Sequence, residues 1–462
     1  MLAGLAFRQL FTKIKKAHIM KTFIKYIAVL SLGTFALQSC STNNVAGIKK
    51  DISTTASAYE VTALLPRAEN LSQEEFMQIE KKFNTLKGDY ASDKSNMESL
   101  IKIAEIYIYE ARVSGEHPHY YGAALKTLDE VLRNQDKLSK DQEFTALFYK
   151  STVQLSQHKF AEALETGNKA RAINGLNAGI YGVLVDANVE LGNYDKAIEL
   201  CDKMVEIRPD LRSYSRQSYI REIHGDVHGS KTAMLNAINA GAPYSEYKCW
   251  SLCTLGGIYE GEGKLDSANI CYQYATQERE NYPFGIAGMA RIMNKKGETQ
   301  EAIKLYKKAM EVLPEIGFNI ELASIYKEQN ANEKVASMTT AIAEMFEEDI
   351  ASGHNMALEF ATFEANFNQD YKKALKYAEQ EANVRPKNID VNKTLASIHY
   401  KLGNKKEAKR YIKIARSTGK QDADLACIEG LILGDKSMIK ASFIQNPFQD
   451  HLLAEEGKSM IQ

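Results

Sequence analysis

Apolar and small residues recur with helical spacing along most of the chain, and polar residues fill the positions between them. The pattern is clearest in three segments that start with leucine and a small residue: Leu255–Tyr259, Leu322–Tyr326 and Leu395–His399. Spacing of this kind predicts helices that each bury one stripe. Only 8 of the 462 residues are proline, and because proline breaks helix interiors, its scarcity favours uninterrupted helices.

The helical pattern itself repeats. Each unit has two predicted helices, and a small side chain at a fixed place on the second helix lets neighbouring helices approach closely. This position recurs every 33 to 39 residues, at Ala124, Ala163, Ala197, Ser230, Ala268, Ala302, Val335, Ala374 and Ala408.

Turn and stop signals lie at fixed offsets from these small residues. A glycine five positions earlier permits the left-handed turn that ends a first helix, and a proline twelve positions later ends a second helix. The glycines are Gly192, Gly225, Gly263, Gly297 and Gly403, and the prolines are Pro209, Pro314 and Pro386. Together these signals predict nine helix–turn–helix units within residues 97–420.

The units resemble the tetratricopeptide repeat, a helix–turn–helix unit of about 34 residues. The resemblance implies an all-α fold, a right-handed α-α superhelix of about nine repeats in which stacking buries a continuous core. The match is weakest where Gly115–Tyr121 lengthens a turn, where Ser230 replaces alanine, and where Glu381 takes a position that is normally small.

Capping helices are expected at both ends of the repeats. Ser72 followed by acidic residues is typical of a helix start, which predicts an N-terminal capping helix within residues 71–95. Residues 421–462 are expected to supply C-terminal capping helices and a tail.

Residues 1–39 have the layout of a secretory leader. The basic stretch Met20–Lys25 precedes the apolar run Tyr26–Leu37, which is too short to span a bilayer. We take Met20 as the expected start; the alternative is that residues 1–19 are a basic extension. The ending Leu37–Cys40 resembles the lipobox of bacterial lipoproteins, which implies lipidation of Cys40. The alternative is an ordinary signal peptide followed by an unrelated cysteine.

The lipoprotein resemblance implies a location in the bacterial cell envelope. Lipid on Cys40 would be the only attachment to a membrane, since no internal span is predicted. Ser41 favours the outer membrane, and the absence of an acidic cluster after Cys40 favours the periplasmic face. Residues 40–70 begin rich in Ser, Thr, Asn and Ala and are expected to form a flexible tether.

Charge argues against nucleic acid as a partner. The chain carries 58 basic and 59 acidic residues, a net charge of −1. Six of the basic residues lie in the leader, which has no acid, so the rest of the chain has 52 basic against 59 acidic residues, or −7. Proteins that bind nucleic acid usually present a basic surface.

No residue pattern predicts catalysis, a cofactor or a metal site. Cys249, Cys253 and Cys271 lack further ligands at metal spacing, so we interpret them as small core residues, with a disulfide as the alternative. His224 and His228 have the spacing of a zinc pair, but a turn separates them. The histidines of Glu116–His119 are expected to be solvated loop residues.

In tetratricopeptide proteins the first helices line a concave groove that takes peptides or helices. The resemblance places nine residues of this chain there: Arg212, Tyr219, Trp250, Phe284, Arg291, Asn294, Phe363, Lys393 and Tyr400. Trp, Tyr and Arg commonly dominate interface energies. The alternative for Trp250 and Phe284 is packing between adjacent units.

The predicted function is a non-catalytic, lipid-anchored scaffold that binds an unidentified protein or peptide in this groove. The alternative is an accessory protein of polysaccharide or peptidoglycan machinery that binds a glycan there.

Overall fold

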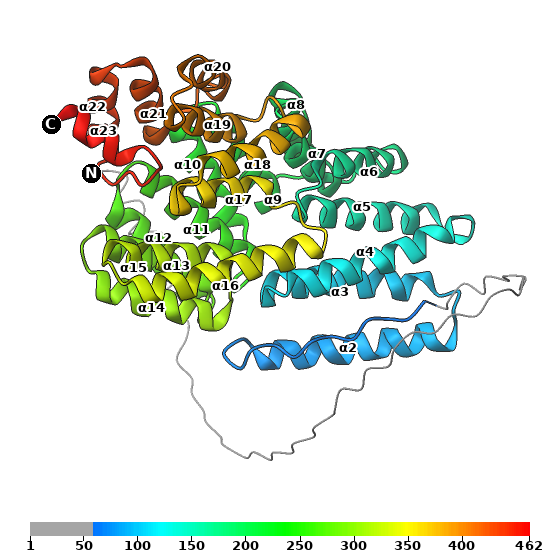
Figure 1. Ribbon diagram of the computed structural model, residues 1–462. Coiled ribbons are helices and arrows are strands. Elements are labelled where there is room, and N and C mark those ends of the chain that lie inside the picture. The colour runs from blue at the N-terminus through cyan, green and yellow to red at the C-terminus, as the bar shows by residue number, and fades with distance from the viewer. Residues whose placement is uncertain (1–58) are drawn as a thin grey trace, which may run out of the picture. The chain divides into compact units, whose positions relative to one another are not determined.

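The computed structural model describes residues 59–462, and this part of the chain folds as helices joined by loops (Figure 1). Residues 1–58, with Met20 and Cys40, lie outside the described residues, so the leader and lipidation stay predictions. Antiparallel helix pairs follow one another in chain order, and each helix packs against the next. The described chain is therefore a helical solenoid.

Ten helix pairs make up the solenoid. The first helices are α3 (Met97–Ser114), α5 (Lys140–Ser156), α7 (Ala178–Glu190), α9 (Leu211–Ile223), α11 (Glu246–Gly261), α13 (Pro283–Lys295), α15 (Ile316–Glu328), α17 (Ala357–Phe363, continued by the π-helical turn Glu364–Asn368), α19 (Ile389–Lys401) and α21 (Ala423–Leu433). The second helices are α4 (His117–Arg133), α6 (Phe160–Ile173), α8 (Tyr194–Ile207), α10 (Val227–Ala240), α12 (Leu265–Glu278), α14 (Thr299–Val312), α16 (Asn332–Ala351), α18 (Tyr371–Val384), α20 (Lys405–Ala415) and α22 (Lys436–Gln445).

The nine predicted units are confirmed as the pairs from α3–α4 to α19–α20. Eight of the nine small residues that define the repeat are buried, and Val335 is half-buried. Ser230 is tolerated because its hydroxyl lies 3.0 Å from that of Ser218 on the partner helix, so neither buried oxygen lacks a hydrogen bond.

The turns between paired helices have the left-handed backbone that the glycines predicted. The five turn glycines have φ between +68° and +83°. Units without glycine use the same backbone, because His158, Asn330 and Gln369 occupy the equivalent position with φ of 55° to 57°. Such values are uncommon outside glycine and asparagine.

Residues 59–68 pack along α3 and α4 as an extended segment, which corrects the expectation of a tether reaching residue 70. The Tyr59 hydroxyl lies 2.6 Å from Thr127 Oγ1, and the Leu65 amide donates to the Tyr120 hydroxyl at 3.0 Å. Val61 is buried in the core of the first pair. Tyr59, Leu64 and Leu65 also pack against this core.

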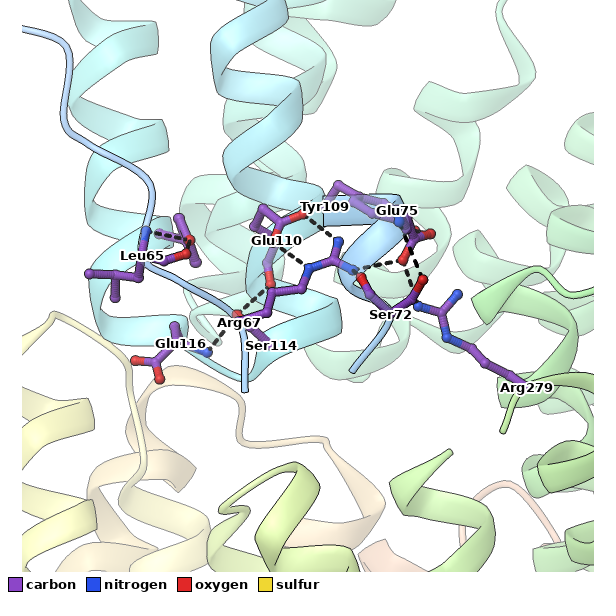
Figure 2. A network of polar contacts seen from close by, with 10 residues as sticks. Leu65, Arg67, Ser72, Glu75, Tyr109, Glu110, Ser114, Glu116 and Arg279 are labelled. Carbon is purple, nitrogen blue, oxygen red and sulfur yellow. Dashed lines mark hydrogen bonds and ion pairs between the residues drawn. The ribbon is translucent and has the colours of Figure 1, made fainter. Parts of the chain in front are cut away.

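Arg67 connects this segment to the N-terminal capping helix α2 (Gln73–Ser92) and to α3 (Figure 2). Its guanidinium donates to both carboxylate oxygens of Glu110, at 2.6 and 2.9 Å, and to Glu75 at 2.7 Å. Glu75 also accepts from Arg279, at the end of α12. The predicted capping helix is therefore held by the ion pair of Glu75 with the buried Arg67, and the N-cap serine Ser72 caps its first turn.

A second kind of contact joins parts of the solenoid that lie about 195 residues apart. The turns after α5 and α7 each meet a loop much further along the chain, and we call these contacts the seam. Arg385 donates to Glu190 at 2.6 Å, and the Ile389 amide donates to the Tyr194 hydroxyl at 2.8 Å. The Asn355 amide donates to the Gln157 carbonyl at 3.0 Å, and α16 packs against α4 (Figure 1).

The C-terminal end is closed by α21, α22 and the last helix, α23 (Ala454–Ile461). α23 packs on both helices of the preceding pair, and Leu453 just before it is fully buried. α21 and α22 form the tenth helix pair, and α23 covers that pair. Within residues 59–462, no helix is both long enough and apolar enough to cross a membrane.

Candidate functional site

The first helices are linked side by side through charged and phenolic groups. Arg291 on α13 lies 3.3 Å from both carboxylate oxygens of Glu260 and 3.4 Å from Glu321 Oε1, and it donates to the Tyr272 hydroxyl at 3.1 Å. Lys295 donates to Glu260 at 2.7 Å. Burial alone would raise the pKa of Glu260, but Arg291 and Lys295 lower it below its usual range. Arg291 therefore joins α11, α13 and α15.

A second group of charges surrounds Tyr247 on α11. The Arg112 guanidinium lies 4.3 Å from the ring centroid and that of Arg212 lies 4.8 Å from it. Arg112 also donates to Glu246 at 2.9 Å, and Tyr282 donates to the same carboxylate at 3.1 Å. Arg212 differs from Arg112, because it is exposed and no described carboxylate pairs with it.

Trp250 and Arg212 occupy equivalent positions in adjacent units, thirteen residues before Gly263 and Gly225. Trp250 is 43% exposed. It shares one face of α11 with Thr254, Gly257 and Gly261, which follow it by four, seven and eleven residues. A methyl group placed on Gly257 or on Gly261 would meet nothing within 4 Å. We call Arg212, Trp250, Thr254, Gly257 and Gly261 the Trp250 surface.

Several of the predicted partner-binding residues pack inside the solenoid instead. The Phe284 ring contacts those of Tyr282 and Phe318, at centroid distances of 5.8 and 5.5 Å, as the packing alternative had it. Phe363 is only 3% exposed and stacks on Phe367, so its prediction as a partner contact is wrong.

The other predicted residues lie at separate places. Tyr219 on α9 is half-buried, and burial, followed by the nearby Glu190 and Asp390, raises its pKa well above the usual value. Lys393 on α19 is half-buried and lowers the pKa of Asp422, which burial alone would raise. Asn294 is half-buried in the last turn of α13. Tyr400 lines a shallow depression with Tyr371, Lys401, Lys405 and Glu456. The structure therefore does not bring the nine residues together as one site.

The cysteines behave as core residues in the described structure. Cys249 and Cys271 are fully buried, and burial raises the pKa of each thiol to about 12. Cys253 is half-buried, and all three are free thiols. In the described part of the chain, no three His, Cys, Asp or Glu residues are placed to hold a metal ion.

The expectation of solvated histidines before α4 is wrong. His117 is the first residue of α4 and stacks on Tyr121 with centroids 5.2 Å apart. Burial lowers its pKa to about 4. His119 lies 2.9 Å from the Ala63 carbonyl in an exposed contact, so the expectation is wrong for His117 alone.

Sequence reasoning missed the seam, although one irregular residue pointed to it. Glu381 occupies a normally small position, is 2% exposed and pairs with Arg385. Its other oxygen accepts from Asn355 at 2.5 Å. A buried carboxylate in a small-residue position therefore marked a long-range ionic contact.

The geometry defines a class, an all-α solenoid of helix pairs, and a family model matches part of it. Residues 154–216 match the family model described as tetratricopeptide repeat. No curated protein sequence matches the chain.

Among solved structures, PilF from Pseudomonas aeruginosa is 14% identical with a TM-score of 0.37, over 45% of this chain and 94% of that one. A structure of MamA is 20% identical with a TM-score of 0.28, over 35% of this chain and 93% of that one.

Proposed function

We propose that this protein is a non-catalytic scaffold that binds another protein or peptide on the Trp250 surface. Tetratricopeptide repeats suggest a protein-binding scaffold, and the match over residues 154–216 supports this class. The observation that carries the proposal is the exposed indole of Trp250 on the same helix as Tyr247, whose ring the exposed guanidinium of Arg212 covers. These two residue types are frequent energetic centres of interfaces.

The test places a photo-crosslinking amino acid at position 250 in the intact envelope, with position 270 as the matched control. Ile270 is 41% exposed on the second helix α12, so it has similar exposure on a different kind of helix. Crosslinks that form at position 250 and do not form at position 270 support the proposal. With the captured partner purified, Trp250→Ala should weaken binding about 30-fold, corresponding to about 2 kcal/mol, and Ile270→Ala should not. Equal binding by both variants would contradict the proposal.

The glycan alternative predicts a different loss. Trp250→Ala with Arg212→Ala would then abolish retention on isolated peptidoglycan and leave protein co-purification intact. Arg291 is unsuitable for this test because its replacement would disconnect three helices.

We further propose that Cys40 is lipidated and holds the protein at the outer membrane, facing the periplasm. The support is the lipobox-like ending Leu37–Cys40 after an apolar run. Globomycin, which blocks processing of lipoprotein signals, should cause the unprocessed form to accumulate, and Cys40→Ala should abolish incorporation of labelled palmitate. Unchanged membrane attachment and labelling in Cys40→Ala would refute the anchor.

A further inference from the structure

Three histidines from separate elements meet at one contact of the seam. His158 comes from the turn between α5 and α6, and His354 comes from the loop between α16 and α17. Their ring centroids lie 4.6 Å apart, edge to face. His117, at the start of α4, is close enough to His354 for the two to influence each other's charge. The contact and its edge therefore carry three imidazole rings.

The backbone that holds this contact runs directly past the rings. The Asn355 amide donates to the Gln157 carbonyl at 3.0 Å, and His158 Nδ1 lies 3.1 Å from the Asn355 carbonyl. His354 is 10% exposed, and neither of its ring nitrogens has a hydrogen-bond partner. Burying an imidazole whose two nitrogens both lack hydrogen-bond partners costs free energy. This cost lowers the stability of the closed contact.

Burial keeps the flanking histidines neutral. It lowers the pKa of His117 to about 4, and Asp349 opposes this effect while His354 and Arg112 add to it. Burial also lowers the pKa of His158, with Glu359 opposing and His354 and Arg385 adding. A proton on one of these rings therefore disfavours a proton on the next.

Carboxylates at the same contact moderate its response to acid. Asp349 Oδ1 lies 3.9 Å from His354 Nδ1, and Glu359 Oε1 lies 3.5 Å from His158 Nδ1. Both would attract an imidazolium. Burial raises the pKa of Glu315, with Asp349 adding and His354 opposing, so this group binds a proton more readily in the closed state and opposes opening in acid.

We propose that His117, His158 and His354 form an acid-sensitive latch that holds the α5–α6 turn against the α16–α17 loop at neutral pH and releases it on acidification. An open contact returns His117 and His158 to water, where a histidine titrates near pH 6.5. The closed state then binds fewer protons than the open state between about pH 6.5 and 4, so its stability falls as the pH falls through that window.

The neighbouring seam contact between Arg385 and Glu190 should respond to acid differently from the histidine contact. Burial raises the pKa of Glu190 to about 7, with Arg385 opposing. A raised carboxylate pKa means that the closed state binds more protons than the open state, so acidification from pH 7 does not weaken this contact. Acid sensitivity is therefore expected at the histidine contact and not along the whole seam.

Hydrogen exchange of the full chain at pH 7.5 and 5.0, corrected for intrinsic exchange rates, tests the latch. Protection of residues 352–356 should fall on the order of 10- to 30-fold at pH 5.0, because lowering the pKa of His117 from about 6.5 to about 4 has that effect at this pH. Protection of α7 and of residues 386–390 should not fall in parallel. This comparison needs no variant.

Two variants assign the effect. His117→Gln with His158→Gln removes the two rings whose pKa burial lowers and should leave residues 352–356 nearly equally protected at both pH values. His228→Gln, at an exposed histidine on α10, should behave like the unaltered protein. Unchanged protection of residues 352–356 in the unaltered protein overturns the latch, and so does an equal loss in the double variant.

Discussion

The Arg67 side chain contacts both α2 and α3 at the N-terminal end of the solenoid. It and Glu110 have fully buried side chains, and Glu75 gives Arg67 a second carboxylate (Figure 2). A buried ion pair gains little over a well-packed apolar pair, but breaking it from one side leaves a buried charge. Replacing one partner of this pair should therefore destabilise the fold more than replacing both with apolar residues.

We predict that Arg67→Met lowers the free energy of opening of α2 and α3 by about 3–5 kcal/mol. Arg67→Met with Glu110→Leu should recover much of that loss, because no unpaired carboxylate remains at position 110. Amide exchange of α2 and α3 measures both effects, and Lys82→Met, at an exposed position of α2, is the control. A double variant as unstable as the single one would contradict this account.

A second residue-scale prediction concerns Gln369, which has φ of 57° at an exposed turn position. A left-handed backbone costs an ordinary residue about 1–2 kcal/mol, and glycine avoids this cost while losing more entropy on folding. Gln369→Gly should therefore stabilise the α17–α18 pair by about 0.5–1 kcal/mol, seen as a higher melting temperature. Gln369→Ala keeps the strained backbone and should give no gain.

At the scale of helices, the features that could be predicted from the sequence are those set by signals within one repeat unit. Small anchors, turn glycines and terminal prolines act within one unit, so Gly192 and Pro209 placed a turn and a helix end without knowledge of the rest of the chain. His117 and residues 59–68 were misplaced because their environments come from elements distant in sequence, whereas Phe363 was misplaced because a π-helical turn continues its helix and stacks Phe367 on its ring. For the Trp250 surface, the positions of Arg212 and Trp250 were predictable from the repeat, but their exposure was not.

Two turn glycines form a matched pair for testing the seam at this scale. Gly192 and Gly297 have φ of +77° and +83°, so alanine strains both turns similarly, by about 1 kcal/mol. A methyl group at Gly192 would lie 2.6 Å from the Lys387 backbone, whereas one at Gly297 would meet nothing within 4 Å.

Gly192→Ala should therefore destabilise clearly more than Gly297→Ala and should also reduce amide protection of residues 387–391. Denaturant unfolding and hydrogen exchange together separate backbone strain from the clash. Equal losses in the two variants would show that the seam yields to the added methyl group without cost.

At the scale of the described molecule, the seam changes how a repeat protein should unfold. In an ordinary solenoid each unit contacts only its neighbours, and sections unfold independently once interfaces weaken. Here Arg385 joins Glu190 across 195 residues, and Ile389 is buried in a cluster made by α7 to α9. These contacts couple units that the chain order keeps apart, so a single cooperative transition is expected.

Arg385→Gln should remove that coupling, because Arg385 is 4% exposed and pairs with both Glu190 and Glu381. We expect urea unfolding of this variant to begin earlier and to broaden into two transitions, with a smaller denaturant slope in each, since each then exposes less surface. Arg410→Gln, whose arginine is mostly exposed and pairs within one helix, should leave the transition single. A lower midpoint with an unchanged slope in Arg385→Gln would mean that the seam adds stability without joining the two parts of the solenoid.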